Sequence, residues 1–376
     1  MRFIRDLTGG FEFRRVPWVL LGAAVVLALV GALFITSAHS AQLAKRHLVF
    51  MVIGVVAFIC VALFDYRHLA SLSVPLYIAG MLALALLPVL GVTINNARRW
   101  YDFGPFSAQP SEPMKYAVIL IVATYFTCHG RIDRLRDLVV PLALTAAPML
   151  LILRQPDLGS AMLLLPSFFV IAFFAGRVPL RNIVLLILAG VFLSLAAWFT
   201  PGAIKEGQRE RVISFINPQS IPDAPASYNA MQATLAVTAG GAAGQGWGQG
   251  RLNRLRRIPE RHTDFIFAVI AEEWGFFRTS AIVALYLLVM VFLARMTNRT
   301  HDRFGRLVSV GVLSIFAFQS LLHMAISLRL TPITGLTLPL ISYGGSSLVS
   351  TFAGFGLVAS VAARRGTVFS IAEPEA

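Results

Sequence analysis

The sequence predicts an all-α integral membrane protein with about ten transmembrane helices, folded as a single membrane domain over residues 1–376. Composition is the first indication: 57% of the 376 residues are hydrophobic, 13% are charged and the mean hydropathy is +0.74. An ordinary soluble domain is about one quarter charged. The second indication is that apolar runs long enough to cross a bilayer recur along the whole chain. The third is that arginines gather in alternate short segments between these runs.

The apolar runs define the expected helices. Each has roughly 17–25 residues, the length needed to span a bilayer. The first run is too long for a signal peptide and a second follows almost at once, so we expect a retained anchor. One long loop, about 200–264, separates the seventh and eighth helices. The expected helices lie near 17–37, 47–64, 73–93, 112–128, 139–155, 158–176, 182–200, 265–293, 306–329 and 346–363.

The distribution of arginine predicts the side of the membrane that each loop faces. Short cytoplasmic loops carry an excess of Lys and Arg, whereas long loops escape this rule. We therefore expect both termini in the cytoplasm and the loop 200–264 outside. The segments assigned to the cytoplasm carry Arg2, Arg5, Arg14, Arg15, Arg67, Arg131, Arg134, Arg136, Arg177, Arg181, Arg295, Arg299, Arg303, Arg306, Arg364 and Arg365.

The net charge of +14 follows from this topology. The basic residues are spread over several cytoplasmic segments with no soluble domain to present them, so we expect contact with lipid headgroups and no nucleic-acid partner. Cys60 and Cys128 both lie near the inner ends of spans, which predicts neither a disulfide nor a cysteine metal site.

Asp264 stands where the long polar loop ends and a strongly apolar run begins at Phe265. Partial burial at such a junction raises the pKa of a carboxyl group, while the neighbouring Arg261 would lower it. A carboxylate whose pKa is close to the working pH is suited to general-base catalysis. The alternative is an acid in the first turn of a helix that Thr263 caps.

Two more charged residues fall where charge is costly. Lys115 lies just inside the fourth run, and Asp157 lies in the short connection after Pro156. Lys115 either reaches the outer headgroups or lines an internal cavity. Asp157 is either a helix-start acid or the partner of a buried cation, and the short connection favours a pair with Lys115.

A further acid, Glu272, is expected on the same helix face as Asp264. The two residues and Ala268 follow the spacing i, i+4 and i+8. Such a face must look into protein or water rather than lipid.

The long loop also offers groups that bind phosphate. The glycine-rich stretch Gly240–Gly250 is followed by several arginines, the last of them Arg261. Bare amides and guanidinium groups both bind phosphate oxygens, so a pyrophosphate site is one interpretation. No strand precedes the glycines and no Gly-Lys-Ser/Thr follows them, so the stretch is not a P-loop. The alternative is a flexible loop with a basic face against anionic lipid.

The last span is expected to begin at a glycine-flanked helix start. The segment 331–339 interrupts the helical pattern, and Ser342-Tyr343-Gly344-Gly345-Ser346-Ser347 follows it. Unpaired N–H groups at such a start form an anion site. The alternative is a capped helix after a tight turn.

Taken together, these segments resemble the SEDS family (shape, elongation, division and sporulation proteins), and its RodA branch in particular, over nearly the whole chain. Ala268 and the short N-terminal tail are more similar to RodA than to the division paralogue FtsW. The matching motifs are Ala97-Arg98-Arg99-Trp100, Gln109-Pro110-Ser111-Glu112 with Lys115, Gln155-Pro156-Asp157-Leu158-Gly159, Gly240–Gly250, Pro259–Phe267 with Glu272-Glu273-Trp274-Gly275, and Ile341-Ser342-Tyr343-Gly344-Gly345-Ser346-Ser347.

The resemblance implies ten helices in the bacterial cytoplasmic membrane and polymerisation of lipid II, a lipid-linked disaccharide-pentapeptide, into glycan strands outside it. It implies that Asp264 is essential and catalytic and that Lys115 and Asp157 line the same cavity. A class B penicillin-binding protein as partner, and support by a divalent cation (Mg or Mn), are likewise expectations from the family. The substrate-binding residues that we expect are Arg98, Arg99, Glu112, Arg209, Arg211, Arg261, His262, Thr263, Glu272, Ser342, Gly344, Gly345 and Ser346.

The sequence departs from the family pattern at four positions. Arg278 and Arg329 stand where the family usually has glycine. His323 stands where asparagine is common, and Thr337 replaces a frequent proline.

The expected reaction converts an α-linked donor sugar into a β-linked product, so it inverts configuration and needs one base for the acceptor hydroxyl. Asp264 is the candidate. The pyrophosphate leaving group needs nearby cations rather than a proton donor. A lipid II flippase is the rival function, although the sequence shows no paired half-repeats. A non-catalytic scaffold would leave Asp264, Lys115 and Asp157 without a purpose.

Overall fold

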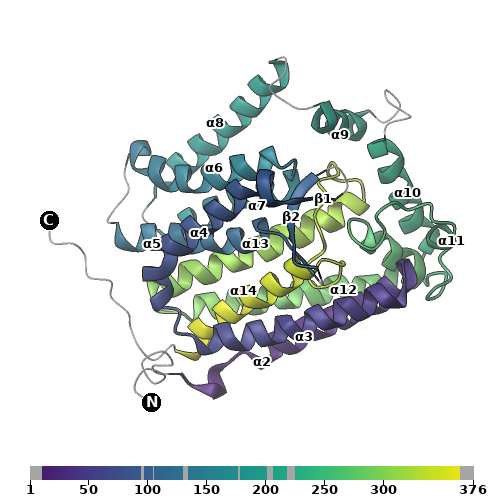
Figure 1. Ribbon diagram of the computed structural model, residues 1–376, viewed down its shortest axis with the longest axis horizontal. Helices are drawn as coiled ribbons and strands as arrows, with labels where there is room; N and C mark the ends of the chain where they lie inside the picture. The colour runs from purple at the N-terminus through teal and green to yellow at the C-terminus, as the bar shows by residue number, and fades with distance from the viewer. Residues whose placement is uncertain are drawn as a thin grey trace.

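The computed structural model describes residues 11–94, 97–104, 106–129, 134–176, 178–200, 206–217 and 225–364, and most of them are helical (Figure 1). The elements in chain order, with η for a 3₁₀ helix, are η1 (Phe13–Arg15), α2 (Trp18–Ala38), α3 (Ala41–Leu63), α4 (His68–Leu90), β1 (Val92–Ile94), β2 (Ala97–Asp102), β3 (Ser107–Ala108), α5 (Ser111–Cys128), η2 (Leu135–Leu138), α6 (Val139–Arg154), α7 (Leu158–Phe174), α8 (Leu180–Phe199), α9 (Glu206–Ile216), α10 (Pro225–Gly240), α11 (Arg251–Arg254), α12 (Ile266–Asn298), α13 (Arg303–Ser327) and α14 (Gly345–Ala363).

The predicted all-α membrane fold is confirmed. A helix occupies each of the ten ranges expected from the sequence, and in the described part of the chain eight helices are long and apolar enough to cross a membrane. The other two are α7, which is apolar but has 17 residues, and α5, which carries Glu112 and Lys115 in its first turns. Of the arginines used to predict orientation, Arg2, Arg5, Arg131, Arg177 and Arg365 lie outside the described residues.

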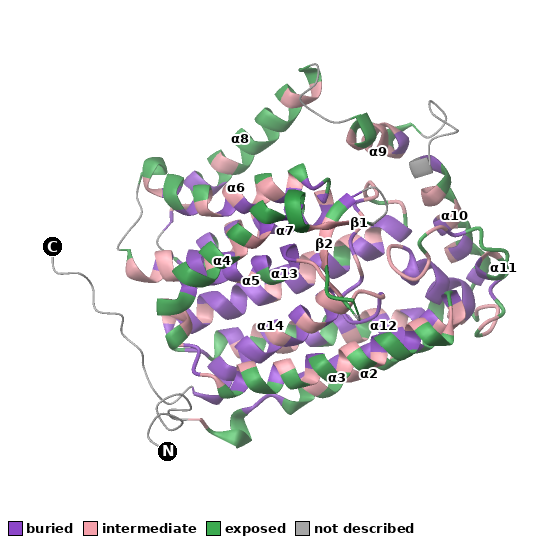
Figure 2. Ribbon diagram, viewed as in Figure 1, coloured by how far each residue is buried: buried purple, intermediate pink, exposed green. Residues whose placement is uncertain are grey.

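The centre of the bundle is formed by α13 and α14 (Figures 1 and 2). In their most apolar windows, 72% of the α13 residues and 83% of the α14 residues are buried. Close approach explains how α14 packs against α3. A side chain at Gly54 would collide with Phe352, and one at Gly356 would lie 2.7 Å from the Phe58 carbonyl. Small residues allow membrane helices to pack at this distance. By contrast, α8 projects from the bundle and only 11% of its apolar window is buried.

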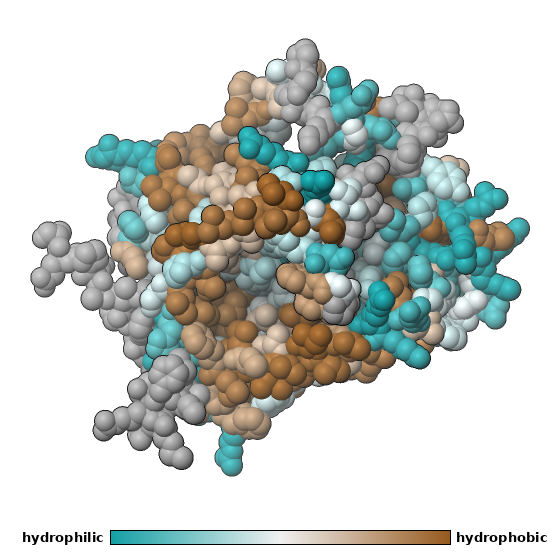
Figure 3. All heavy atoms as spheres, in the orientation of Figure 1, coloured by the Kyte–Doolittle hydropathy of each residue, from teal (hydrophilic) through white to brown (hydrophobic). Residues whose placement is uncertain are grey.

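The surface of the molecule separates into an apolar band and polar ends. In Figure 3, hydrophobic residues cover the flanks of the helices, and hydrophilic residues gather over α10 and α11. Exposed apolar side chains such as Val89, Phe192 and Phe199 are typical of a surface that faces lipid. The band therefore fits a membrane-spanning protein with its polar loops outside the hydrocarbon core.

A small antiparallel sheet follows α4, and it was not predicted from the sequence. β1 pairs with β2, and β2 pairs with β3. Arg98 fastens this sheet, because its guanidinium group donates to the Thr93 hydroxyl (3.1 Å) and to the Pro88 carbonyl (2.6 Å). The sheet carries the next residue, Arg99, to the mouth of the bundle.

The α12 helix is broken at Gly275, where φ is +70° and ψ is −177°. The glycine-rich stretch Gly240–Gly250 fills the break, since the N–H of Phe276 donates to the Gly241 carbonyl (2.8 Å) and the N–H of Gln245 donates to the Glu272 carbonyl (3.0 Å). Backbone groups freed inside a membrane protein need such partners. The predicted role of these glycines in a pyrophosphate site is wrong, because the N–H groups of Gln245 and Gly246 bind carbonyls of α12 and the stretch does not line the cavity described below.

Candidate active site

A cavity of about 620 Å³ opens at the end of the bundle where α3, α5, α7, α12 and α14 begin. This volume is within the usual range for sites that hold small ligands. The predicted residues that line it come from six separate stretches of the chain: Arg99, Glu112, Asp157, Arg211, His262, Thr263, Asp264, Gly344, Gly345 and Ser346.

Asp264 lies in a tight turn just before α12. The N–H groups of Thr263, Asp264 and Phe265 all donate to the carbonyl of Glu260, whose φ is +42°. The helix begins at Ile266 and no side chain caps it, so Asp264 is not a first-turn acid and Thr263 is not a cap. The turn is also tied to the segment before α14, because the Ser342 hydroxyl donates to the Thr263 carbonyl (2.6 Å).

The electrostatic environment of Asp264 differs from the expected one. Burial, with a smaller contribution from the negative charge of Glu260, raises the pKa of Asp264 to about 7. Arg211 and Arg99 oppose this rise, whereas the sequence suggested Arg261. The guanidinium group of Arg261 instead donates to the carbonyl of Asn253. A carboxyl group with this pKa can take up and release a proton near neutral pH.

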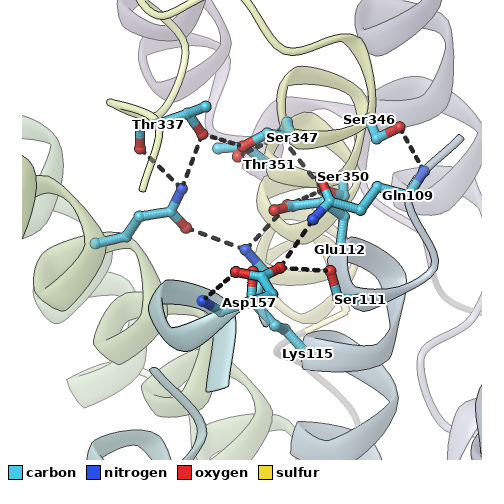
Figure 4. Close-up of polar contacts among 12 residues, drawn as sticks. Gln109, Ser111, Glu112, Lys115, Asp157, Thr337, Ser346, Ser347, Ser350 and Thr351 are labelled. Carbon is cyan, nitrogen blue, oxygen red and sulfur yellow. Dashed lines mark hydrogen bonds and ion pairs between the residues drawn. The ribbon is translucent and has the colours of Figure 1, made fainter. Parts of the chain in front are cut away.

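Asp157 lines the same cavity as Asp264 and is the N-cap residue of α7. Its Oδ1 accepts from the N–H of Ser160 (3.2 Å), and its Oδ2 accepts from the side-chain amide of Gln109 (3.0 Å; Figure 4). The Arg99 guanidinium lies 3.9 Å from Oδ1 and also donates to the carbonyls of Gln155 and Pro156. Arg99 thus holds the short connection between α6 and α7 and supplies positive charge to the cavity.

Lys115 is buried on α5, but its partner is not the predicted one. Its ammonium group lies 2.9 Å from Glu112 Oε2 and 3.1 Å from Gln319 Oε1 (Figure 4). The predicted pair of Lys115 with Asp157 is wrong, because Asp157 is held by Arg99 and Gln109. The i, i+3 spacing of Glu112 and Lys115 on one helix explains the observed pair. Glu112 lines the cavity and Lys115 does not, so Lys115 affects the cavity through its ion pair with Glu112.

The start of α14 presents backbone amides to the cavity. Gly344 is its N-cap residue and no side chain caps the helix, so the first N–H groups have no partner within the helix. A side chain at Gly345 would lie 2.6 Å from the ring of Phe50, which explains a glycine there. Ser346 fixes the neighbouring strand, since its hydroxyl accepts from the N–H of Gln109 (3.0 Å).

Several predicted site residues do not line the cavity. The guanidinium group of Arg209 lies over the Trp198 ring, 5.3 Å from its centroid. Glu272 is fully buried and accepts from the N–H groups of Leu252 and Asn253, so it holds the loop before α12 and does not share a face with Asp264. The residues outside the lining are Lys115, Arg98, Arg209, Arg261, Glu272 and Ser342.

Other residues line the cavity but were not predicted as site residues. Gln109 belongs to a motif that we recognised, and its contact with Asp157 could not be inferred from spacing. Gly335 has φ +75°, and a side chain there would lie 3.6 Å from Asp264 Oδ2. A glycine in an otherwise apolar segment was the available signal. The polar or glycine residues in this group are Arg46, Gly104, Ser107, Gln109, Ser160, Asn229, Glu260, Thr334, Gly335, Thr337, Tyr343 and Ser347.

The described residues do not gather three His, Cys, Asp or Glu side chains that could hold a metal ion. Mg²⁺ is commonly bound by one or two carboxylates together with substrate phosphates. Glu112, Asp157, Glu260 and Asp264 line the same cavity, but the described carboxylates are not gathered closely enough to form a metal site by themselves. No catalytic step is assigned to a metal ion.

Comparison with known proteins identifies the family. Residues 14–366 match the protein-family model of FtsW, RodA and SpoVE, described as "Cell cycle protein". The chain belongs to this family. The match spans every helix from α2 to α14 and every residue that lines the cavity.

Individual members of the FtsW/RodA/SpoVE family are similar over nearly their whole length. Peptidoglycan glycosyltransferase MrdB of Escherichia coli K12 is 32% identical, with 92% of each chain covered. Peptidoglycan glycosyltransferase RodA of Treponema pallidum is 30% identical, covering 93% of this chain and 98% of the relative. A solved structure described as "Structural coordination of polymerization and crosslinking by a peptidoglycan synthase complex" contains a chain 33% identical, with a TM-score of 0.82, covering 93% of this chain and 98% of that one.

The structure shows the environment of the four residues that depart from the family pattern. Arg278 is exposed on α12 just after the break. Arg329 has φ +56°, a left-handed conformation that favours the usual glycine. His323 is fully buried and contacts the Leu336 carbonyl, and Thr337 lines the cavity.

Proposed function

We propose that this FtsW/RodA/SpoVE member is a peptidoglycan glycosyltransferase. It polymerises lipid II into glycan strands on the outer face of the bacterial cytoplasmic membrane, during cell elongation. The observation that carries the proposal is Asp264, a partly buried carboxyl group with a pKa of about 7 in a cavity that Arg46, Arg99 and Arg211 also line. The names of the relatives MrdB and RodA support the same activity.

Each charged group has a chemical task in this proposal. Asp264 takes the proton from the attacking hydroxyl of the acceptor sugar, which then displaces the pyrophosphate from the anomeric carbon with inversion. Arg99 and Arg211 both line the cavity and act electrostatically on Asp264, and they stabilise the charge that develops on the leaving group. The amides at the start of α14 provide a further site for a phosphate oxygen. A divalent cation held by pyrophosphate and cavity carboxylates is compatible with this arrangement.

Purified protein incubated with lipid II tests the proposal. The wild-type chain should form polymer, alone or with a class B penicillin-binding protein, and Asp264→Asn should lower the rate by about 10²–10⁴-fold, the usual contribution of a general base. Asp264→Asn keeps the shape of the side chain, so the amount of folded protein should not fall. Near-normal polymer yield from Asp264→Asn would sink the assignment of the base and favour a lipid II flippase.

We also propose the class B penicillin-binding protein as the partner. The similar chain of known structure belongs to a complex that couples polymerization with crosslinking. A membrane enzyme that only polymerises would need a second enzyme to crosslink its product.

A further inference from the structure

The segment 331–344 forms one wall of the cavity without regular secondary structure. Irregular backbone at membrane depth is tolerated only where its polar groups find partners. In the described structure three side chains of α12 and α13 donate to its carbonyls. His323 Nδ1 contacts the Leu336 carbonyl at 2.8 Å, Gln319 Nε2 donates to the Thr337 carbonyl at 3.0 Å, and the Tyr286 hydroxyl donates to the Pro339 carbonyl. Arg211 of α9 donates to a further carbonyl, that of Ile333, at 3.3 Å. The wall is therefore held from α9, α12 and α13.

Gln319 differs from the other two donors because its amide has a second contact. While Nε2 donates to Thr337, Oε1 accepts from the ammonium group of Lys115 at 3.1 Å. Gln319 is 2% exposed, so both contacts form away from water. A carbonyl can only accept and an ammonium group can only donate, so the amide orientation is fixed. A carboxylate of the same size could satisfy Lys115 but not the carbonyl.

The two contacts of Gln319 lead to two groups of residues that line the cavity. On one side, Lys115 pairs with Glu112, whose Oε2 also accepts from Ser350 (3.0 Å; Figure 4). On the other side, the Thr337 hydroxyl donates to Ser347 (3.1 Å). Glu112, Thr337 and Ser347 line the cavity, whereas Gln319 does not.

The Thr337 side of this network leads to the base. Gly335 is two residues away, and a side chain there would lie 3.6 Å from Asp264 Oδ2. The same segment is bound to the Asp264 turn, because the N–H of Tyr343 donates to the His262 carbonyl (2.9 Å). A shift of the segment therefore changes the surroundings of Asp264 directly.

We infer that Gln319 is a positioning residue for glycosyl transfer: its side-chain amide fixes the distance between the buried Lys115–Glu112 pair and the cavity wall beside Asp264. The inference rests on the proposed function. Gln319 acts through Lys115 and Thr337 and does not touch the substrate. Losing it leaves Lys115 with Glu112 alone and leaves the Thr337 carbonyl without its donor.

Two variants separate this role from simple packing. Gln319→Met keeps the length of the side chain and removes both hydrogen bonds. His323→Leu also removes a contact to a carbonyl of the same wall, at Leu336, but it leaves Lys115 and its partners in place. If only packing mattered, the two variants would behave alike.

Purified variants with lipid II, measured for kcat, KM and thermal stability, give the test. Gln319→Met should lower kcat by at least about tenfold, because misplacement by 1 Å can cost about a hundredfold, and should change KM less than about threefold. His323→Leu should lose a similar amount of thermal stability but less than about threefold in kcat. Equal kcat losses in the two variants, or a Gln319→Met enzyme within about threefold of wild type, would overturn the inference.

Two further measurements keep the outcome clear. If Gln319→Met does not fold, Gln319→Glu replaces it, and a kcat within about threefold of wild type in that variant overturns the inference. Melting temperatures of Gln319→Met, Lys115→Met and the double variant test the contact without any substrate. The double variant should lose less than the sum of the single losses, and strict additivity would show that the residues do not interact. A wild-type protein that makes no polymer would refute the proposed function, and the stability cycle would still stand.

Discussion

The pKa of Asp264 results from two opposing influences. Burial disfavours the carboxylate, while Arg211 and Arg99 favour it, and the result is a pKa of about 7. Neither influence alone would suit a base at neutral pH. With burial alone the carboxyl group would stay protonated, and with the arginines alone it would be too weak a base.

This balance predicts opposite pH trends for activity and stability. The proposed base, Asp264, would act when deprotonated, so the polymerisation rate should rise with pH through about 7 and level off above it. The raised pKa means that the folded protein binds the proton more tightly than the unfolded chain. Its contribution to stability is therefore complete below the ordinary carboxyl pKa of 3.8 and is lost as the pH rises through about 7.

Asp264→Asn checks the stability trend, because the amide is neutral at every pH. The melting temperature of this variant should exceed that of wild type at pH 8, and the difference should shrink towards pH 5. Thermal unfolding in detergent at both pH values measures it. A difference that does not depend on pH would show that Asp264 does not titrate in this range.

The backbone conformation of Arg329 predicts that a substitution at this position would raise the stability of the protein. It follows the end of α13 in a left-handed conformation, and the N–H of Leu330 donates to the Ala325 carbonyl (2.8 Å) as in a Schellman motif. A side chain in that conformation costs roughly 1–2 kcal/mol, which glycine avoids. Arg329→Gly should therefore raise the free energy of unfolding by about 1 kcal/mol. Arg329→Lys keeps the Cβ atom and should show no gain in the same thermal assay.

At the scale of elements, the regular helices could be predicted from the sequence and the irregular segments could not. The length of an apolar run predicts where a span such as α2 or α3 lies, because the thickness of the bilayer sets the length of the helix. The break at Gly275 has no such signature, since a glycine alone does not show that a helix is interrupted. Its backbone partners come from Gly240–Gly250, about 30 residues earlier in sequence.

The candidate site shows the same limit. Lys115 and Asp157 could be identified because charge at membrane depth is costly wherever the chain folds. Asp264 could be identified from its place at the start of an apolar run, and Glu112 only through the family motif. The partners of these residues depend on which helix starts meet, so the sequence suggested Asp157 for Lys115 and the structure has Glu112. Contacts across elements, such as that of Gln319 with Lys115, carry no local signal.

The break in α12 predicts that one added methyl group, at Gly275, would strongly lower the stability of the protein. An added Cβ atom at Gly275 would lie 2.1 Å from the backbone nitrogen of Gly244, and its φ of +70° is unfavourable for alanine. Gly275→Ala should lower the free energy of unfolding by about 2 kcal/mol or more. Gly22→Ala on α2 is the matched control, because nothing lies within 4 Å of its added Cβ atom and alanine favours a helix. Equal thermal stability of the two variants would contradict the close approach at the break.

At the scale of the whole molecule, the cavity lies at one end of the bundle. Alternate helices begin there, and α12 runs from the Asp264 turn to Asn298 at the other end, a length of roughly 50 Å for 33 residues. The arginines Arg295, Arg299, Arg303 and Arg306 lie at that far end. If short basic loops face the cytoplasm, Asp264 faces outward, the side on which the glycan grows.

Cysteine labelling in intact cells tests this orientation. In a background without Cys60 and Cys128, Arg257→Cys places a thiol in the exposed loop before α12, and Arg299→Cys places one just after it. The charge of the short loops predicts that an impermeant thiol reagent labels the first position in intact cells and the second only after the membrane is opened. Both side chains are exposed, so a difference in labelling reports the side of the membrane rather than burial. The reverse pattern would place the cavity on the cytoplasmic side, where Asp264 would have no growing glycan strand to act on.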